Sequence, residues 1–346
     1  MSLPSGTFQE SYAQDMAIFR TRTHWVLLLV FLSFLFTSPL FFSDRILTIF
    51  TIIGITIISV LGLNILTGYC GQISIGHAGF MAVGGYTSAI LTAKLGWPFW
   101  TALPAAGLMA GVIGLIFGLP SLKIKGFYLI MATIAAQFII IWVILQLYDV
   151  TGGADGLAVP RPVIGGLVFK SKASYFYLVM VLTCLATYLA KNIVRTRVGR
   201  AFIAIRDNDL AAEVMGVNLW TYKLTAFFIG CVYAGVAGSL LVHYYAFASV
   251  DQFPFMNSVW YLGMLIIGGM GSTAGAIFGA IFLKLLDELV TIIGPVLSAA
   301  VAPQAAASLS LIMRGLVIVL FLIFEPRGLA HRWELVKAYY RRWPFT

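Results

Sequence analysis

Long apolar runs, separated by short polar or glycine-rich stretches, dominate the chain from residue 25 to residue 324. Most of them approach the length of about 20 residues that a helix needs to cross the hydrocarbon core of a bilayer. A membrane β-barrel would instead show short segments of alternating polarity. The pattern predicts an all-α, polytopic transmembrane helical bundle of about ten spans, over residues 25–42, 46–64, 79–95, 99–119, 127–148, 174–190, 224–247, 257–270, 273–292 and 306–324.

The composition agrees with a lipid environment. Of the 346 residues 60% are apolar and only 10% are charged, whereas about a quarter of the residues of a soluble domain are charged. The three cysteines are far apart, which argues against a zinc site or a disulfide framework. The motifs GxxxxGK[ST], GxSxG and HExxH are absent. We therefore expect a chain that is not an enzyme and that holds neither ATP, a cofactor nor a metal ion.

The basic residues predict the orientation, because cytoplasmic loops are enriched in Lys and Arg. With the N-terminus inside, the outer loops hold five basic residues: Arg45, Lys94, Arg161, Lys170 and Lys172. The inner segments hold fifteen: Arg20, Arg22, Lys123, Lys125, Lys191, Arg195, Arg197, Arg200, Arg206, Lys223, Arg327, Arg332, Lys337, Arg341 and Arg342. This bias accounts for the net charge of +9 without nucleic acid. It predicts a multi-pass protein with both termini cytoplasmic.

The same reading divides the chain into three parts. Residues 1–24 form a cytoplasmic N-terminal segment, residues 25–324 the transmembrane domain, and residues 325–346 a basic cytoplasmic tail. A cytoplasmic loop, 191–223, interrupts the transmembrane domain. We expect the first span to be retained, because no small-residue cleavage site follows the apolar run after Arg22.

A polar, glycine-rich stretch, Asn64 to Gly79, lies at membrane depth. Glycine weakens a helix by roughly 1 kcal/mol per residue relative to Ala. Irregular backbone at this depth persists only where it is buried in protein or lines a wet cavity. The stretch therefore predicts a broken helix, as in transporters. The alternative is a cytoplasmic loop with ordinary glycine turns, and His77 could equally be a hydrogen-bonded bundle residue.

The cytoplasmic loop 191–223 alternates apolar and charged residues, as a short amphipathic helix would. Ala211, Ala212 and Gly216 give an A-A-x-x-x-G spacing, which suits docking into a groove of another protein. A helix lying on the membrane surface is the alternative. Ionisable residues within predicted spans are Lys284, Asp287, Glu288 and Arg314. They predict either a proton relay or ion pairs near the interface.

Six segments together resemble one family of transport proteins. They are LTGYCGQISIGHAGFMAVGGYT (66–87), SLKIKGFYLIMATIAAQ (121–137), TGGADGL (151–157), VGRAFIAIRDNDLAAEVMGVN, GGMGSTAGAIFGA and FEPRGLA. The chain resembles the branched-chain amino-acid permeases of ATP-binding-cassette (ABC) transporters, and most resembles the larger of their two permease subunits. The resemblance covers residues 45 to 330. It departs at Leu210, where the family's coupling motif usually has an acidic residue.

The resemblance implies an importer in the inner membrane of a prokaryote. Its partners would be a second related permease, two cytoplasmic ATPase subunits that bind ATP and Mg, and an external solute-binding protein. The residues implied to line the translocation path are Thr67, Gly68, Gly71, Gln72, Ser74, Gly76 and His77. Those implied to couple to the ATPases are Arg200, Arg206, Asp207, Ala211, Ala212 and Gly216. Thr151, Gly152 and Gly153 would lie near the binding protein.

Three functional hypotheses stay open from the sequence. The first is the importer, for branched-chain amino acids or for urea, short amides or aromatic acids. The second is a stand-alone channel for a small polar solute, which the glycine-rich break alone would allow. The third is a proton-driven transporter that uses Lys284, Asp287 and Glu288. The basic, amphipathic inner loop favours the importer, because a channel has no need of it.

Overall fold

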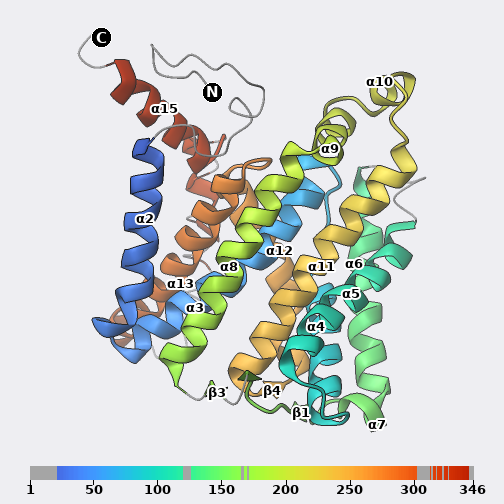
Figure 1. The fold of residues 1–346 in the computed structure, drawn as a ribbon, viewed down its shortest axis with the longest axis vertical. Coiled ribbons are helices and arrows are strands. Elements are labelled where there is room, and N and C mark those ends of the chain that lie inside the picture. Colours follow the sequence, from blue (N-terminus) through green and yellow to red (C-terminus); the bar gives the residue numbers. More distant parts are fainter. Residues whose placement is uncertain are drawn as a thin grey trace.

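A computed structural model of the protein (Figure 1) describes residues 22–119, 126–164, 167–169, 171–301 and 327–342, with residues 312, 315, 316, 318–321 and 323–325 between the last two ranges. The described chain is mostly helical, as the hydrophobic pattern predicts. Between its ends, a helix satisfies its backbone hydrogen bonds within one segment, which the bilayer interior requires. The elements are α2 (Arg22–Thr37), η1 (Ser38–Leu40), α3 (Asp44–Leu63), η2 (Asn64–Tyr69), α4 (His77–Ala93), α5 (Phe99–Gly118), α6 (Phe127–Gln146), α7 (Tyr148–Thr151), α8 (Lys172–Arg195), α9 (Arg197–Asp207), α10 (Asp209–Val214), α11 (Leu219–Tyr245), η4 (Val250–Gln252), α12 (Phe255–Gly268), α13 (Thr273–Val301) and α15 (Leu329–Arg342).

The predicted count of about ten spans is not confirmed. Within the described ranges, five helices are long and apolar enough to cross a membrane: α3 with its continuation η2, then α5, α6, α8 and α11. Helices α12 and α13 are bent by 120° at their junction, and together they make a sixth span if the pair counts as one. Helix α4 has only 17 residues. The tenth predicted span, 306–324, falls mostly outside the described residues, as do Arg314 and residues 1–21.

Helix α3 is the centre of the bundle. It packs against α8, α11, α12 and α13, and its second half is buried almost without interruption. The large side chains Ile55, Ile58, Leu61 and Leu63 belong to the main core cluster and are fully buried. A helix that is apolar on all sides and enclosed by neighbours is a core element.

Helices α4, α5 and α11 form a second tightly packed group. A Cβ added to Gly84 of α4 would lie 2.2 Å from the Cα of Gly235 in α11. One added to Gly238 of α11 would lie 1.9 Å from the carbonyl oxygen of Met81 in α4. Small residues let helices approach closely where no hydrophobic effect drives their association. The backbones of α4 and α11 are therefore in direct contact.

The two ends of the bundle carry different elements (Figure 1). At one end lie α9, α10 and α15, and at the other lie α7 and the short strands. Strand β1 (Leu157–Ala158) pairs antiparallel with β4 (Phe247–Ala248), and β2 (Val163–Ile164) with β3 (Leu167–Val168). The loop 191–223 and the tail thus share one end, as the charge pattern predicts. Which side of the membrane this end faces stays a prediction.

Candidate functional site

The glycine-rich stretch after α3 is irregular, as both the predicted broken helix and the alternative loop between two spans require. Helix α3 continues as the π-helical turn η2 (Asn64–Tyr69), and regular helix resumes only at His77, where α4 begins. π-Helical turns are rare and often occur at functional sites. The polar side chains of Gln72 and Ser74 are buried within the bundle. We refer to residues 64–76 as the break.

The first turn of α4 is capped by side chains of other helices. Ser258 Oγ in α12 accepts a hydrogen bond from the Ala78 N–H at 2.9 Å, and Gln137 Oε1 in α6 accepts one from the Gly79 N–H at 2.5 Å. Ser258 donates to Gln137 Oε1 at 3.2 Å, and Gln137 Nε2 donates to the carbonyl of Phe253 at 3.1 Å. The first N–H groups of a helix have no partner in their own helix. This buried network therefore joins α4 to α6 and α12.

His77 is buried and links α4 to α3 through a hydrogen bond. Its Nε2 lies 2.9 Å from the carbonyl oxygen of Ser59 in α3. The imidazole meets the ring of Tyr261 edge to face, with centroids 6.3 Å apart. The side chain is only 1% exposed. The arrangement matches the hydrogen-bonded bundle residue that the sequence left open as an alternative to a path residue.

Gln72 is a buried polar residue of a different kind. Its backbone N–H donates to the carbonyl of Leu66 at 3.1 Å, and its carbonyl accepts from Thr67 Oγ1 at 3.0 Å. Neither polar atom of the side-chain amide has a hydrogen-bond partner among the described residues. Leaving such a group unsatisfied costs about 1–3 kcal/mol. The amide is thus available for a contact that this conformation does not contain.

A polar cavity of about 380 Å³ lies between the break, the start of α6 and the junction of α9 with α10. Its size falls within the range of small-molecule sites, roughly 300–1,000 Å³. It is lined by Cys70, Gly71, Gln72, Gly126, Leu129, Ile205, Arg206, Asp207, Asn208, Asp209 and Lys223. The Cys70 side chain is 2% exposed. The cavity brings the break and the predicted coupling loop together.

Arg206, at the end of α9, contacts the break directly. Its Nη1 donates to the carbonyl of Gly68 at 3.1 Å. A Cβ on Gly271 would lie 2.7 Å from the same nitrogen, and one on Gly68 would lie 2.0 Å from Asn64 Oδ1. Asn64 Oδ1 also accepts from the Gly271 N–H at 3.0 Å. We call these four residues, Asn64, Gly68, Arg206 and Gly271, the Arg206 junction, because only glycine fits at its two closest approaches.

The predicted coupling loop, residues 191–223, has exposed apolar side chains around α10. Asn208 caps α10 by accepting from the Ala211 N–H at 3.0 Å. Ala212 is buried, whereas Val214 and Met215 are 87% and 83% exposed. Helices in water normally turn such side chains inward. Three other predicted coupling residues have local roles. Asp207 forms an ion pair with Arg206, and Arg200 donates a hydrogen bond to the Arg195 carbonyl at 3.1 Å. Gly216 follows α10 with a φ of +86°.

Thr151, Gly152 and Gly153 lie in a tight turn at the end of the bundle opposite α9 and α10 (Figure 1). Thr151 Oγ1 donates to the Ile144 carbonyl at 2.6 Å and accepts from the Gly153 N–H at 3.1 Å. The adjoining strand β1 pairs with β4, which follows α11. The turn is thus held against the bundle, at the end where an external partner is predicted.

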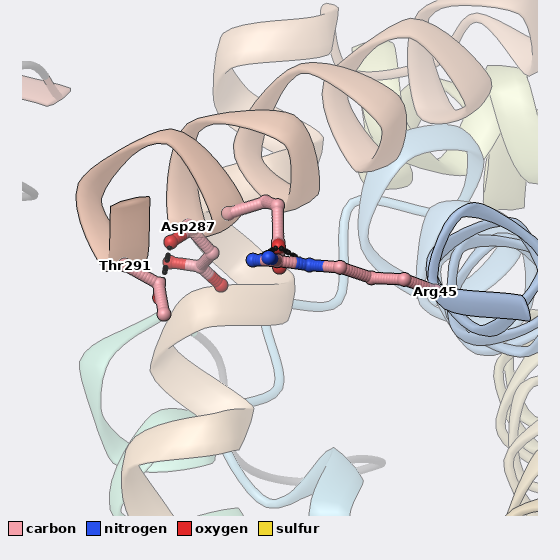
Figure 2. A network of polar contacts seen from close by, with 4 residues as sticks. Arg45, Asp287 and Thr291 are labelled. Carbon is pink, nitrogen blue, oxygen red and sulfur yellow. Dashed lines mark hydrogen bonds and ion pairs between the residues drawn. The ribbon is translucent and has the colours of Figure 1, made fainter. Parts of the chain in front are cut away.

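Three of the predicted intramembrane charges, Lys284, Asp287 and Glu288, are ion-paired near the middle of α13 (Figure 2). Arg45 of α3 reaches Glu288, and Lys284 lies 4.0 Å from Asp287, whose carbonyl accepts from Thr291 Oγ1. The side chains are partly exposed. These side chains lie at the protein surface and do not form a buried series of ionisable groups along which a proton could pass. This favours the ion-pair interpretation over the proton relay. Within the described residues, no group of three His, Cys, Asp or Glu side chains could hold a metal ion.

Three residues of the site, Asn64, Gln137 and Ser258, were not singled out from the sequence. Each bonds backbone groups of an element far along the chain. Gln137 carried a signal, because it is an isolated amide within an apolar run and such a group needs a partner. Nothing in the sequence identifies that partner.

Comparison with known proteins identifies the chain's relatives. The family model described as branched-chain amino acid transport system / permease component matches residues 45–322. The high-affinity branched-chain amino acid transport system permease protein LivM of Escherichia coli is 32% identical over 283 residues, which cover 75% of this chain and 64% of that protein. The chain thus spans less than two thirds of the length of this relative.

Two further relatives are more distant. The probable branched-chain amino acid transport permease protein LivM of Methanocaldococcus jannaschii is 25% identical over 238 residues, 66% of this chain and 67% of that protein. The E. coli permease protein LivH is 26% identical over 241 residues, 63% of this chain and 76% of LivH. Of the two E. coli permeases, the chain is thus more similar to LivM, at 32% identity, than to LivH, at 26%.

Proposed function

This chain belongs to the family of branched-chain amino acid transport permeases, and we propose that it is the larger permease subunit of an ABC importer. In this proposal it carries branched-chain or related amino acids across the inner membrane of a prokaryote, with both termini cytoplasmic. A LivH-like permease is the partner within the membrane, two ATPase subunits dock inside, and a binding protein delivers the solute outside. The chain itself hydrolyses nothing.

The α9–α10 loop carries the proposal. Leu210, Val214 and Met215 form an exposed apolar surface at the tip of the bundle, next to charged side chains. Exposed apolar patches with polar rims mark sites of protein association. The same loop touches the break through Arg206. A stand-alone channel offers no use for such a surface, whereas an importer requires one for its ATPases.

The break supports a solute path. Within the described part of the chain the side-chain amide of Gln72 has no hydrogen-bond partner, and the cavity beside it is polar and of small-molecule size. Substrates other than branched-chain amino acids, such as urea, short amides or aromatic acids, are alternatives within the same mechanism. The binding protein, rather than this chain, is expected to choose among them.

Co-purification tests the proposal. The full chain, solubilised from its native host, is expected to bring with it two ATPase subunits and a second hydrophobic permease. The assembled complex, reconstituted with the binding protein, should take up radiolabelled leucine only when ATP is supplied at the side of the ATPases. A chain that purifies alone or as a homo-oligomer would overturn the importer in favour of a channel or a proton-coupled carrier.

A further inference from the structure

On the basis of this importer function, we propose that Arg206 is a positioning residue that transmits movement of the α9–α10 loop to two places at once, the break and the bend between α12 and α13. The solute does not need to touch it. Arg206 acts through the carbonyl of Gly68 and through the backbone of Gly271.

The guanidinium is held in one orientation. Nε and Nη2 donate to Asp207 Oδ1 at 3.0 and 2.9 Å, which leaves Nη1 directed at the Gly68 carbonyl at 3.1 Å. The aliphatic part of the side chain lies along Gly71, where an added Cβ would come within 3.0 Å of Arg206 Cγ. A planar guanidinium with several fixed donors can do this, whereas a flexible ammonium cannot. A shift of the end of α9 therefore displaces the break itself.

The break is in turn fixed to the bend between α12 and α13. Asn64 Oδ1 accepts from the Gly271 N–H, and Asn64 Nδ2 donates to the Ser272 carbonyl, both at 3.0 Å. Tyr69 and Thr273 hydroxyls are also 3.0 Å apart. An added Cβ on Gly68 would lie 2.6 Å from the Gly271 nitrogen, so no side chain separates the two backbones. Displacement of Gly68 consequently displaces the bend.

The bend between α12 and α13 also contacts the C-terminal tail, through Gly269. A Cβ added to Gly328 of the tail would lie 2.6 Å from the nitrogen of Gly269, and one added to Gly269 would lie 3.2 Å from Cβ of Ala330. The bend is therefore enclosed between the break and the tail. Closely packed contacts of this kind pass a displacement on rather than absorb it.

The competing explanation is that these contacts only stabilise the folded protein and transmit no movement. The two explanations predict different measurements. A purely stabilising contact would affect only assembly and thermal stability. A transmitting contact would affect how much solute moves for each ATP hydrolysed. Arg206→Met removes the guanidinium and keeps the aliphatic stem beside Gly71. Asn64→Leu removes both bonds to the bend at similar volume. Arg45→Met, an equivalent change at the opposite end of α3, is the matched control.

The test uses the assembled complex, with Cys184 and Cys231 replaced by Ser so that Cys70 is the chain's one remaining thiol. Leucine uptake and ATP hydrolysis are measured in proteoliposomes. Maleimide labelling of Cys70, which lines the cavity beside Arg206, is measured with and without ATP and vanadate. We expect labelling of the parent complex to change on ATP binding. We expect Arg206→Met and Asn64→Leu to lose this change and to lower uptake per ATP roughly tenfold, while Arg45→Met does neither.

Because Arg206 and Asn64 act in series, the double variant should lose no more coupling than the more severe single variant. A parent complex whose Cys70 labelling ignores ATP, or an Arg206→Met complex that keeps both the ATP response and the parental uptake per ATP, would overturn the role of Arg206. A parent complex that hydrolyses ATP without taking up leucine would overturn the proposed substrate alone, because the labelling measurement still decides on Arg206. If Arg206→Met fails to assemble, Asn64→Leu carries the same comparison.

Discussion

Glu288 of α13 accepts two hydrogen bonds from the guanidinium of Arg45, the second residue of α3, at 3.1 and 2.5 Å. At the other end of α3, Asn64 bonds the Gly271 N–H immediately before α13 begins. Helix α3 is thus bonded at its start to the middle of α13 and at its end to the residue two before α13, and these two contacts differ in burial. Arg45 is 65% exposed and Glu288 27%, whereas Asn64 is 1% exposed.

The exposed contact is expected to contribute little. Ion pairs at the surface stabilise a protein by about 0–1 kcal/mol. Arg45→Gln and Glu288→Gln should each leave uptake unchanged and lower stability by no more than about 1 kcal/mol. Uptake by Glu288→Gln should also be insensitive to collapse of the proton gradient when ATP is maintained. Loss of uptake in a correctly assembled Glu288→Gln complex would revive the proton-driven hypothesis.

The contact between α12 and α13 predicts a severe effect of one methyl group. A Cβ added to Gly279 would lie 1.8 Å from the carbonyl oxygen of Met264, so the helices must separate. We expect Gly279→Ala to destabilise the protein by about 1–3 kcal/mol, measured as a lower melting temperature in detergent. Gly263→Ala, where the nearest atoms are 3.8 Å away, is the control and should melt at or above the parental temperature.

Gly216 predicts an effect on coupling. Its φ is +86°, and no atom of the described residues lies within 4 Å of an added Cβ, so the backbone conformation is what restricts this position. Gly216→Val should strain the turn after α10 by roughly 1–2 kcal/mol and uncouple ATP hydrolysis from uptake. Gly216→Asn, which tolerates this conformation better, should retain more uptake. Equal uptake by the parent and Gly216→Val would remove the docking role of this turn.

Gln72→Leu separates a path role from a structural one. The side-chain amide makes no hydrogen bond to any residue that the structure describes, so leucine should leave assembly and melting temperature intact or slightly improved. If Gln72 contacts the solute during transport, leucine uptake should change several-fold. Gln146→Leu, at the exposed end of α6, is the control. Parental uptake by Gln72→Leu would exclude Gln72 from the path.

The burial of Cys70 predicts slow modification of its thiol. The side chain is 2% exposed, and a maleimide must reach the sulfur before its thiolate can react. In the resting complex, maleimide labelling of Cys70 at pH 8 should therefore be slow. Labelling in denaturant provides the reference rate. Rapid labelling of the resting complex at pH 8 would contradict the burial of this residue.

The sequence predicted the elements better than their contacts. Spans 99–119 and 127–148 lie within two residues of α5 and α6 at each end, because apolar periodicity marks a lipid-embedded helix directly. The span count was less secure: α12 and α13 are separate apolar runs along the chain, yet they form one bent pair. Run lengths do not encode a bend angle.

The candidate site shows the same division. Glycine content identified the break between Asn64 and Gly79, since glycine disfavours helix wherever it occurs. The bond from Asn64 to Gly271 joins residues 207 positions apart, and no local pattern specifies such a pairing. His77 is an example. A histidine at this position suited both a residue of the solute path and a buried residue that links two helices, and the hydrogen bond to the Ser59 carbonyl favours the second role.

The glycine contacts between α4 and α11 restrict how this subunit can change shape. With Gly84 against Gly235 and Gly238 against Met81, neither helix can roll or slide on the other without a backbone collision. We therefore expect α4 and α11 to move as one rigid body. Opening and closing must then occur at its margin, where the Gln137 and Ser258 side chains that cap α4 can exchange hydrogen-bond partners without a helix being broken.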